Sequence, residues 1–266
     1  MTAAQNTPSD IPTNHFKRAL AAGKPQIGLW NSLASAVSVE VIAGSGFDWV
    51  LLDMEHSPND LPLMHGQLQA MMGNPGTAPV VRPPWNDMVA IKRLLDLGVQ
   101  NFLIPCVQNA EEAALAVSHT RYPPDGVRGF ASASRATNFG RIPAYWQSAH
   151  EQICVLVQVE TAAALAEIEA IAAVPGVDGI FIGPGDLSAS MGFLGQPSHP
   201  EVIAAIDDAM TRIHAAGQPS GFLTGDEKLA RHYLDMGCQF VAVGADLGLL
   251  ARAADALCAR FKVPQG

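Results

Sequence analysis

Short apolar runs alternate along the chain with Ala-rich segments in which apolar residues recur at helical spacing. This alternation predicts repeated strand and helix units around a parallel sheet. Eight strands are predicted, at residues 25–32, 47–55, 78–84, 101–107, 153–160, 179–185, 219–225 and 240–246. The alternation alone also fits an open, doubly wound sheet, but eight units in 266 residues favour an α/β fold of the (β/α)8 TIM-barrel type.

Two segments depart from this pattern. Residues 1–13 are polar and contain proline, which predicts a disordered tail ahead of a single barrel domain at residues 14–266. Residues 122–149 form a long Gly-, Ser- and Arg-containing connection between the fourth and fifth strands. A connection of this length is expected to be either a lid over the substrate or an insertion that contacts another subunit.

Composition narrows the possible partners. The formal net charge of −9, without a stripe of Lys and Arg, argues against nucleic acid. The chain begins with no signal-peptide pattern and has no apolar run of about 18 residues, so neither secretion nor a membrane span is expected. The four cysteines lie in apolar contexts without C-x-x-C spacing and are expected to be free thiols in a reducing cytoplasm.

Charged residues end four of the predicted strands, where a (β/α)8 barrel carries its chemistry. Each has an ordinary structural explanation by itself, such as a helix N-cap for Asp186 or a surface histidine for His56. Their convergence predicts one polar site at the mouth of the barrel. The residues are Asp53, Glu55 and His56 after the second strand, Arg82 on the third, Glu160 on the fifth and Asp186 after the sixth.

The two carboxylates Glu160 and Asp186 suit Mg²⁺ or Mn²⁺, with coordination positions left for water or a substrate. The turn at residues 183–186, Gly-Pro-Gly-Asp, would bring backbone N–H groups to a helix start beside Asp186, where an anion can bind. Neither H-E-x-x-H nor paired cysteines occur, so a structural zinc site is not expected.

A second group of residues offers proton transfer. If the chain turns after the second strand, Asp53 can accept a hydrogen bond from the His56 ring, which leaves the other ring nitrogen as a base. Glu55 is either a further partner of the metal or a structural carboxylate. Arg82 would stabilise an oxyanion on the substrate. Lys228 lies just beyond the seventh predicted strand, at a helix-like start, and no other lysine lies at a strand end, so a metal-stabilised enolate fits better than a Schiff base.

The segments "GFDWVLLDMEHSPND", "PVVRPPWND", "RYPPDGVRGF", "CVLVQVET", "GVDGIFIGPGDLSASMG" and "FVAVGADLGLLARAA" together resemble the metal-dependent, pyruvate-using class II aldolases. This family is typified by 4-hydroxy-2-oxoheptanedioate aldolase, with 2-dehydro-3-deoxyglucarate aldolase as a relative. The resemblance runs over roughly residues 16–261. It implies a barrel of the phosphoenolpyruvate/pyruvate-binding type, a C-terminal helix exchanged between subunits, and a trimer-based hexamer.

The resemblance also implies residue roles and a cofactor, which would be Mg²⁺, Mn²⁺ or Co²⁺. The substrates would be pyruvate and an aldehyde. The implied roles are Glu160 and Asp186 as metal ligands, His56 with Asp53 as acid/base dyad, Arg82 on the pyruvate enolate, Gln158 near the substrate, Asp96 as a buttress across the subunit boundary, and the amides of Gly185 and Asp186 on the pyruvate carboxylate.

Four residues depart from the family pattern and bear on the substrate. Gly185 stands where "GPADLS" is common, Ala162 where Arg is common, and Leu223 with Thr224 where the pattern is more apolar. The predicted activity is reversible aldol cleavage of 4-hydroxy-2-oxo acids. The alternatives are a sugar-acid aldolase, an oxaloacetate decarboxylase and a barrel without catalysis.

Overall fold

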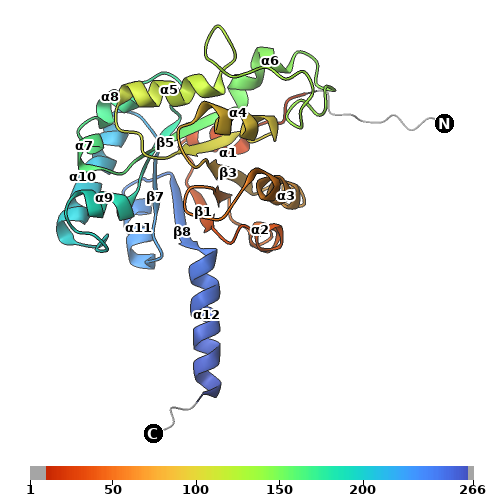
Figure 1. The fold of residues 1–266 in the computed structure, drawn as a ribbon. Helices are drawn as coiled ribbons and strands as arrows, with labels where there is room; N and C mark the ends of the chain where they lie inside the picture. Colours follow the sequence, from red (N-terminus) through yellow and green to blue (C-terminus); the bar gives the residue numbers. More distant parts are fainter. Residues whose placement is uncertain (1–9, 263–266) are drawn as a thin grey trace.

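Eight parallel strands close into a barrel in the order in which they occur along the chain (Figure 1). The structure is a computed structural model that describes residues 10–262. Each strand lies within one of the eight predicted ranges, so the predicted barrel is confirmed. The strands are β1 (Gln26–Asn31), β2 (Trp49–Asp53), β3 (Ala78–Arg82), β4 (Asn101–Ile104), β5 (Cys154–Val159), β6 (Gly179–Ile182), β7 (Ser220–Leu223) and β8 (Phe240–Ala245).

Helices surround the barrel, and several begin at a side chain that accepts a hydrogen bond from a first-turn backbone N–H, such as Asp60 from Leu63. The helices are α1 (His15–Ala21), α2 (Ala36–Ala43), α3 (Leu61–Met71), α4 (Met88–Asp96), α5 (Ala110–Thr120), α6 (Tyr145–Ser148), α7 (Ala162–Leu165), α8 (Ile168–Ala172), α9 (Pro184–Ser190), α10 (Pro200–Ala215), α11 (Glu227–Asp235) and α12 (Asp246–Phe261), with the 3₁₀ helix η1 (Ala149–Gln152).

Alternate residues of each strand face the barrel interior and the helices, as the pleat requires. The interior contains a cluster of buried side chains that includes Trp49, Phe181 and Phe240, while neighbouring strand residues such as Val50 pack against the helices. Phe16 of α1 packs on the rings of Trp49 and Phe240 and closes the N-terminal end. At the other end, the interior positions are occupied by polar residues.

The long connection at 122–149 joins a helix to the next strand, so it lies at the N-terminal end of the barrel with α6. Figure 1 shows it at the end opposite to α12, which leaves the C-terminal end of β8. Of the two alternatives for this segment, the placement rules out a lid over the predicted site of the same chain, because that site lies at the C-terminal end of the barrel. It leaves the connection free to contact another subunit.

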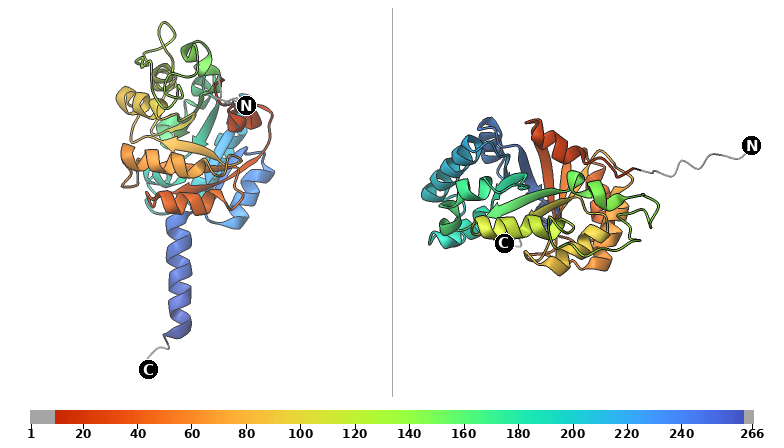
Figure 2. Two further views of the ribbon diagram at one scale, coloured as in Figure 1. Left: turned by 90° about the vertical axis from the view of Figure 1, so that its right-hand side faces the viewer. Right: turned by 90° about the horizontal axis from the view of Figure 1, so that it is seen from above.

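The C-terminal helix α12 projects away from the barrel in Figure 1 and in the left view of Figure 2. All its residues beyond Gly248 are exposed. Of the predicted disordered tail, residues 1–9 lie outside the described residues. Within residues 10–13, the carbonyl of Pro12 accepts a hydrogen bond from Gln100 at 2.7 Å. Between residues 10 and 262, the helices are too short or too polar to cross a membrane.

Candidate active site

The buried carboxylate of Asp53 holds the guanidinium of Arg82 at the C-terminal end of the barrel. These residues end β2 and β3, pair in register, and face the interior. Arg82 donates from Nε to Oδ1 at 2.8 Å and from Nη2 to Oδ2 at 2.7 Å. Burial by itself raises the pKa of Asp53, but the hydrogen bonds and charge of Arg82 outweigh it and hold that pKa below its usual value.

Two further side chains fix the guanidinium. Glu55 Oε2 lies 3.0 Å from Arg82 Nη1. Arg82 Cζ lies over the Trp30 ring, 4.8 Å from the ring centroid, and the indole Nε1 donates to Asp53 Oδ2 at 3.2 Å. A guanidinium has five N–H donors, so donors on Nη1 and Nη2 remain for a substrate oxygen. The arrangement therefore presents a rigid positive group in an otherwise acidic mouth.

Glu160 follows β5 and is also buried, with 1% of its surface exposed. Its Oε1 accepts the backbone N–H of Cys106 at 2.8 Å, and its Oε2 accepts Nε2 of Gln158 at 2.5 Å. Gln158 Oε1 is buried without a hydrogen-bond partner. The backbone of Gly183 passes close to this carboxylate and to the Gln158 amide nitrogen, because a Cβ on Gly183 would stand 2.7 Å from Glu160 Oε2 and 2.9 Å from Gln158 Nε2.

The donor atoms of Glu55, Cys106 and Glu160 lie within 4.8 Å of one another and can hold a metal ion. Two carboxylates and a nearby unpartnered amide oxygen form a donor set that fits a divalent cation. Burial, then the neighbouring Glu160, Glu55 and Asp186, raise the pKa of the Cys106 thiol. The predicted ligand Asp186 lies in the first turn of α9 with an exposed side chain, and it is not one of the three clustered residues.

His56 is exposed at the same mouth, three residues after β2 ends. Its backbone N–H donates to Asp53 Oδ1 at 3.4 Å, beside a 3.0 Å bond from the backbone of Glu55. Both Asp53 oxygens are therefore engaged by Arg82, Trp30 and the backbone. The acid/base dyad between the Asp53 carboxylate and the His56 ring stays a prediction.

Other predicted site residues fall at the same end. Gln158 lies on β5 beside Glu160, and Leu223 is the last residue of β7, packed against the interior cluster. Gly185 is exposed in the first turn of α9. Lys228 is exposed on α11 and ends no strand, as expected for a site that does not use a Schiff base.

Asp96 lies elsewhere. It is the last residue of α4, at the N-terminal end of the barrel, where its carbonyl accepts the backbone N–H of Ala136 at 3.1 Å. Its carboxylate stands 3.8 Å from Nη2 of the buried Arg128. Within one chain, Asp96 is therefore not brought together with His56.

Sequence reasoning missed two members of the site. Cys106 was assigned to an apolar context, but it follows β4 at the mouth and its backbone N–H supports Glu160. Trp30 falls in the predicted strand at residues 25–32 and is not among the predicted site residues, although its indole contacts Asp53 and Arg82. A signal for Trp30 existed, since it occupies an inward position one residue before β1 ends.

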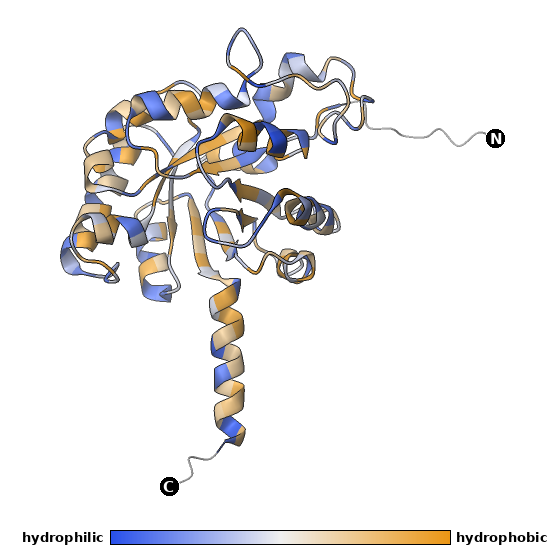
Figure 3. Ribbon diagram, viewed as in Figure 1, coloured by the Kyte–Doolittle hydropathy of each residue, from blue (hydrophilic) through white to orange (hydrophobic). Residues whose placement is uncertain are grey.

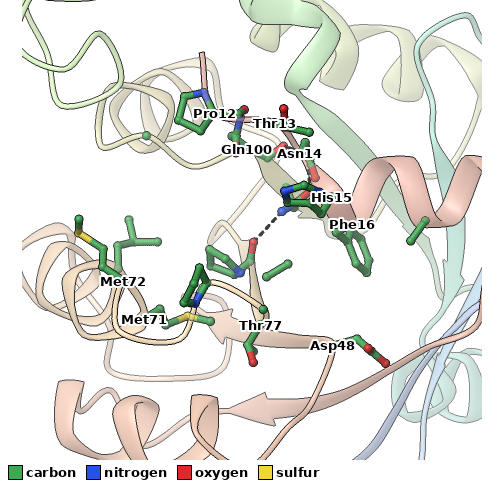
Figure 4. A pocket seen from close by; sticks show the side chains of 18 of the residues that line it. Pro12, Thr13, Asn14, His15, Phe16, Asp48, Met71, Met72, Thr77 and Gln100 are labelled. Atoms are coloured by element: carbon green, nitrogen blue, oxygen red, sulfur yellow. Dashed lines mark hydrogen bonds between the residues drawn. The ribbon is translucent and has the colours of Figure 1, made fainter. Parts of the chain in front are cut away.

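A pocket of about 510 Å³ lies away from this site, between α1, the end of α3 and the start of β3 (Figure 4). Its lining includes Asn14, Met71, Met72 and Thr77. Asn14 donates to Asn101 Oδ1 at 2.7 Å there, a contact that ties α1 to the barrel. The pocket lies at the N-terminal end and contains none of the predicted site residues.

Fold and site together define a (β/α)8-barrel enzyme whose carboxylates and arginine converge at the C-terminal ends of the strands. The sequence matches the HpcH/HpaI aldolase/citrate lyase family over residues 26–253, and the chain belongs to this family. It is accordingly a carbon–carbon lyase.

Individual relatives are similar over nearly the whole chain. A pyruvate aldolase of Rhizobium etli is 55% identical over 252 residues, covering 95% of this chain and 99% of the relative. A 4-hydroxy-2-oxo-heptane-1,7-dioate aldolase of Shigella sonnei is 57% identical over 249 residues, 93% of this chain and 95% of the relative. A crystal structure of a family protein from Burkholderia cenocepacia superposes with a TM-score of 0.90 at 40% identity, covering 93% and 99% of the two chains.

Proposed function

We propose that the protein catalyses the reversible aldol cleavage of 4-hydroxy-2-oxo acids to pyruvate and an aldehyde, with 4-hydroxy-2-oxoheptanedioate as substrate and succinic semialdehyde as the second product. The observation that carries this proposal is the convergence of the fixed Arg82 with Glu160 in a buried polar mouth. The names of relatives that are 55–57% identical agree with it.

Each side chain has its own role in the proposed reaction. Arg82 directs its remaining N–H donors at the oxygen on which negative charge develops when the carbon–carbon bond breaks. Asp53 and Trp30 keep the guanidinium in place without contacting the substrate. In cleavage, His56 removes the proton of the 4-hydroxyl group and then delivers it to the methylene carbon of the pyruvate enolate; in the reverse direction it removes a methyl proton of pyruvate and gives it to the new 4-hydroxyl oxygen. The backbone N–H groups of Gly185 and Asp186 bind the substrate carboxylate, while Gln158 and Leu223 line the pocket.

Glu160 and Asp186 would hold the divalent cation, for which Mg²⁺, Mn²⁺ and Co²⁺ are the candidates. When bound, such a cation supplies Lewis acidity that polarises the keto oxygen of the substrate. Glu160 is prepared for this role, because the Cys106 amide and Gln158 fix both of its oxygens.

We propose further that the site is shared between copies of the chain. Asp96 lies at the end of the barrel opposite to His56, so it can support the histidine only in a neighbouring copy. The exposed apolar side of α12 would pack on another copy, in a trimer-based hexamer. The four free cysteines suit a cytoplasmic location.

The direct test is pyruvate release from 4-hydroxy-2-oxoheptanedioate by protein treated with a chelator, before and after Mn²⁺ or Mg²⁺ is restored. We expect cleavage only with metal, and one succinic semialdehyde for each pyruvate. Cleavage that persists without metal would contradict the metal requirement. If the protein releases pyruvate from oxaloacetate but no aldehyde from 4-hydroxy-2-oxoheptanedioate, the activity is that of a decarboxylase and not of an aldolase.

The same assay tests His56. His56→Ala is expected to lower the cleavage rate by about 10²- to 10⁴-fold, the usual contribution of a positioned general base. His15→Ala, at an exposed histidine of α1 at the other end of the barrel, is the control and should leave the rate unchanged. A His56→Ala enzyme with near wild-type cleavage would remove the histidine from the mechanism.

A further inference from the structure

Cys106 occupies a position at the mouth that the proposed reaction does not use. It follows the short strand β4, and its φ of +57° lies in the left-handed region that side chains rarely adopt. Its backbone N–H donates to Glu160 at 2.8 Å, and its Sγ lies 3.9 Å from Glu55 Oε1. The backbone that supports Glu160 therefore also directs the sulfur toward the two carboxylates.

We propose that the Cys106 sulfur is a ligand of the cation at this site and shifts its preference from Mg²⁺ toward thiophilic divalent ions such as Co²⁺, Zn²⁺ and Cd²⁺. This inference rests on the metal-dependent function proposed above. Its geometric basis is the cluster of Glu55, Cys106 and Glu160, whose donor atoms lie within 4.8 Å of one another. When the sulfur–metal bond forms, the thiol proton passes to the solvent.

The preference follows from ligand chemistry. Mg²⁺ takes oxygen ligands in near-octahedral geometry and gains little from sulfur. Zn²⁺ and other borderline or soft ions bind thiolate strongly, and they also accept carboxylate. A site with only the carboxylates would discriminate weakly between these ions beyond their ordinary order of affinity. A sulfur donor at the same centre strengthens binding of the thiophilic ions selectively.

The other cysteines have different surroundings. Cys154 is buried in the apolar cluster inside the barrel, and Cys238 donates to the backbone carbonyl of Ser220. Cys258 is exposed on α12. In the described residues 10–262, Cys106 is the cysteine that belongs to a group able to hold a metal ion. Cys258 therefore offers a matched control, since it is equally free but distant from the carboxylates.

The test compares wild type with Cys106→Ser and Cys258→Ser. Serine keeps the size and hydrogen-bonding ability of cysteine but is a poor ligand for soft ions. Each protein is loaded with Co²⁺, and its near-ultraviolet spectrum is recorded for a sulfur-to-cobalt charge-transfer band. Calorimetry then gives the dissociation constants of Cd²⁺ and Mg²⁺ separately.

We expect the charge-transfer band in wild type and Cys258→Ser and its loss in Cys106→Ser. Cd²⁺ binding should weaken by about 10- to 100-fold in Cys106→Ser, while Mg²⁺ binding stays the same. An unchanged spectrum and an unchanged Cd²⁺ affinity would overturn the proposal, as would equal weakening of both ions. Wild-type protein that binds neither ion would instead contradict the metal-dependent function itself.

Discussion

At the scale of single residues, the site depends on a close approach of the backbone at Gly183. Its φ of −87° is open to any residue, so the requirement for glycine is one of space. A Cβ there would lie 2.7 Å from Glu160 Oε2 and 2.9 Å from Gln158 Nε2. Glu160 and Gln158 would have to move, and these are the groups proposed to prepare the metal site.

We therefore expect Gly183→Ala to weaken Mn²⁺ binding by about 10- to 100-fold, the range for disturbing groups that orient a ligand. Gly185→Ala is the matched control, since no atom lies within 4 Å of a Cβ there. Alanine in that helical position should instead stabilise the protein by about 0.5–1 kcal/mol. Calorimetric Mn²⁺ titration and thermal unfolding measure the two effects, and equal Mn²⁺ affinity in both variants would contradict the argument.

The sequence could predict the location of residues at the mouth where that location follows from strand alternation. Asp53 and Arg82 end apolar runs, and inward-facing residues there must meet at the barrel mouth. The hydrogen-bond partners of Asp53 could not be predicted from the sequence. Its carboxylate accepts hydrogen bonds from Arg82, from Trp30 and from a backbone N–H, and these groups come from separate parts of the chain. Cys106 was missed for a similar reason, since its backbone has a left-handed φ and donates to Glu160, which follows a different strand.

At the scale of elements, apolar runs predicted every strand of the barrel but placed several ends too late. The run at residues 101–107 continues past Ile104, where β4 ends and the chain turns to form the mouth. The position of the 122–149 connection follows from element order, because a helix-to-strand connection lies at the N-terminal end. Length and composition alone left the lid and the interface equally open.

A buried carboxylate anchors the start of α12 to the opposite side of the barrel closure. Asp246 is buried and accepts hydrogen bonds from Asn31 Nδ2 and from the backbone N–H groups of Ser32 and Leu33, at 2.5, 2.9 and 3.2 Å. These bonds tie the end of β8 to the loop after β1, where the barrel closes. The anchor therefore supports both barrel closure and the direction of α12.

Asp246→Asn replaces one acceptor oxygen by an amide group that faces donors. We expect the free energy of unfolding to fall by about 1–3 kcal/mol, the range for leaving buried hydrogen-bonding groups without partners. Asp255→Asn, in the exposed middle of α12, is the control and should change it by less than about 0.5 kcal/mol. Urea unfolding at neutral pH gives both values, and equal stability of the two variants would show that the anchor is dispensable.

At the scale of the whole molecule, α12 carries an apolar stripe whose leucines and phenylalanine stay half or more exposed within residues 10–262. Leu247, Leu250, Leu257 and Phe261 are 50%, 61%, 50% and 81% exposed. With Ala254 they follow one another at intervals of three and four residues, so they lie on one side of the helix. Figure 3 shows hydrophobic residues along much of this projecting helix. Complete burial of one such leucine or phenylalanine is worth about 1.5–3 kcal/mol, which favours packing against a second copy.

The proposed assembly predicts different effects for two nearby positions of α12. Leu257 belongs to the stripe, whereas Ala259 lies on the opposite side of the helix at ideal helical spacing. Leu257→Glu places a charge in the proposed contact and should lower the molar mass measured by light scattering from that of an oligomer toward that of one chain. Ala259→Glu adds the same charge and should leave the oligomer intact. Circular dichroism should show that the barrel stays folded in both variants, because α12 beyond Gly248 contributes little to the core. A change in molar mass then reports association alone.

Two outcomes would contradict the proposed assembly: a wild-type protein that is a single chain, or two variants that both keep the wild-type mass. In either case α12 does not hold the copies together, and Asp96 has no proposed way to reach His56 of a neighbouring copy.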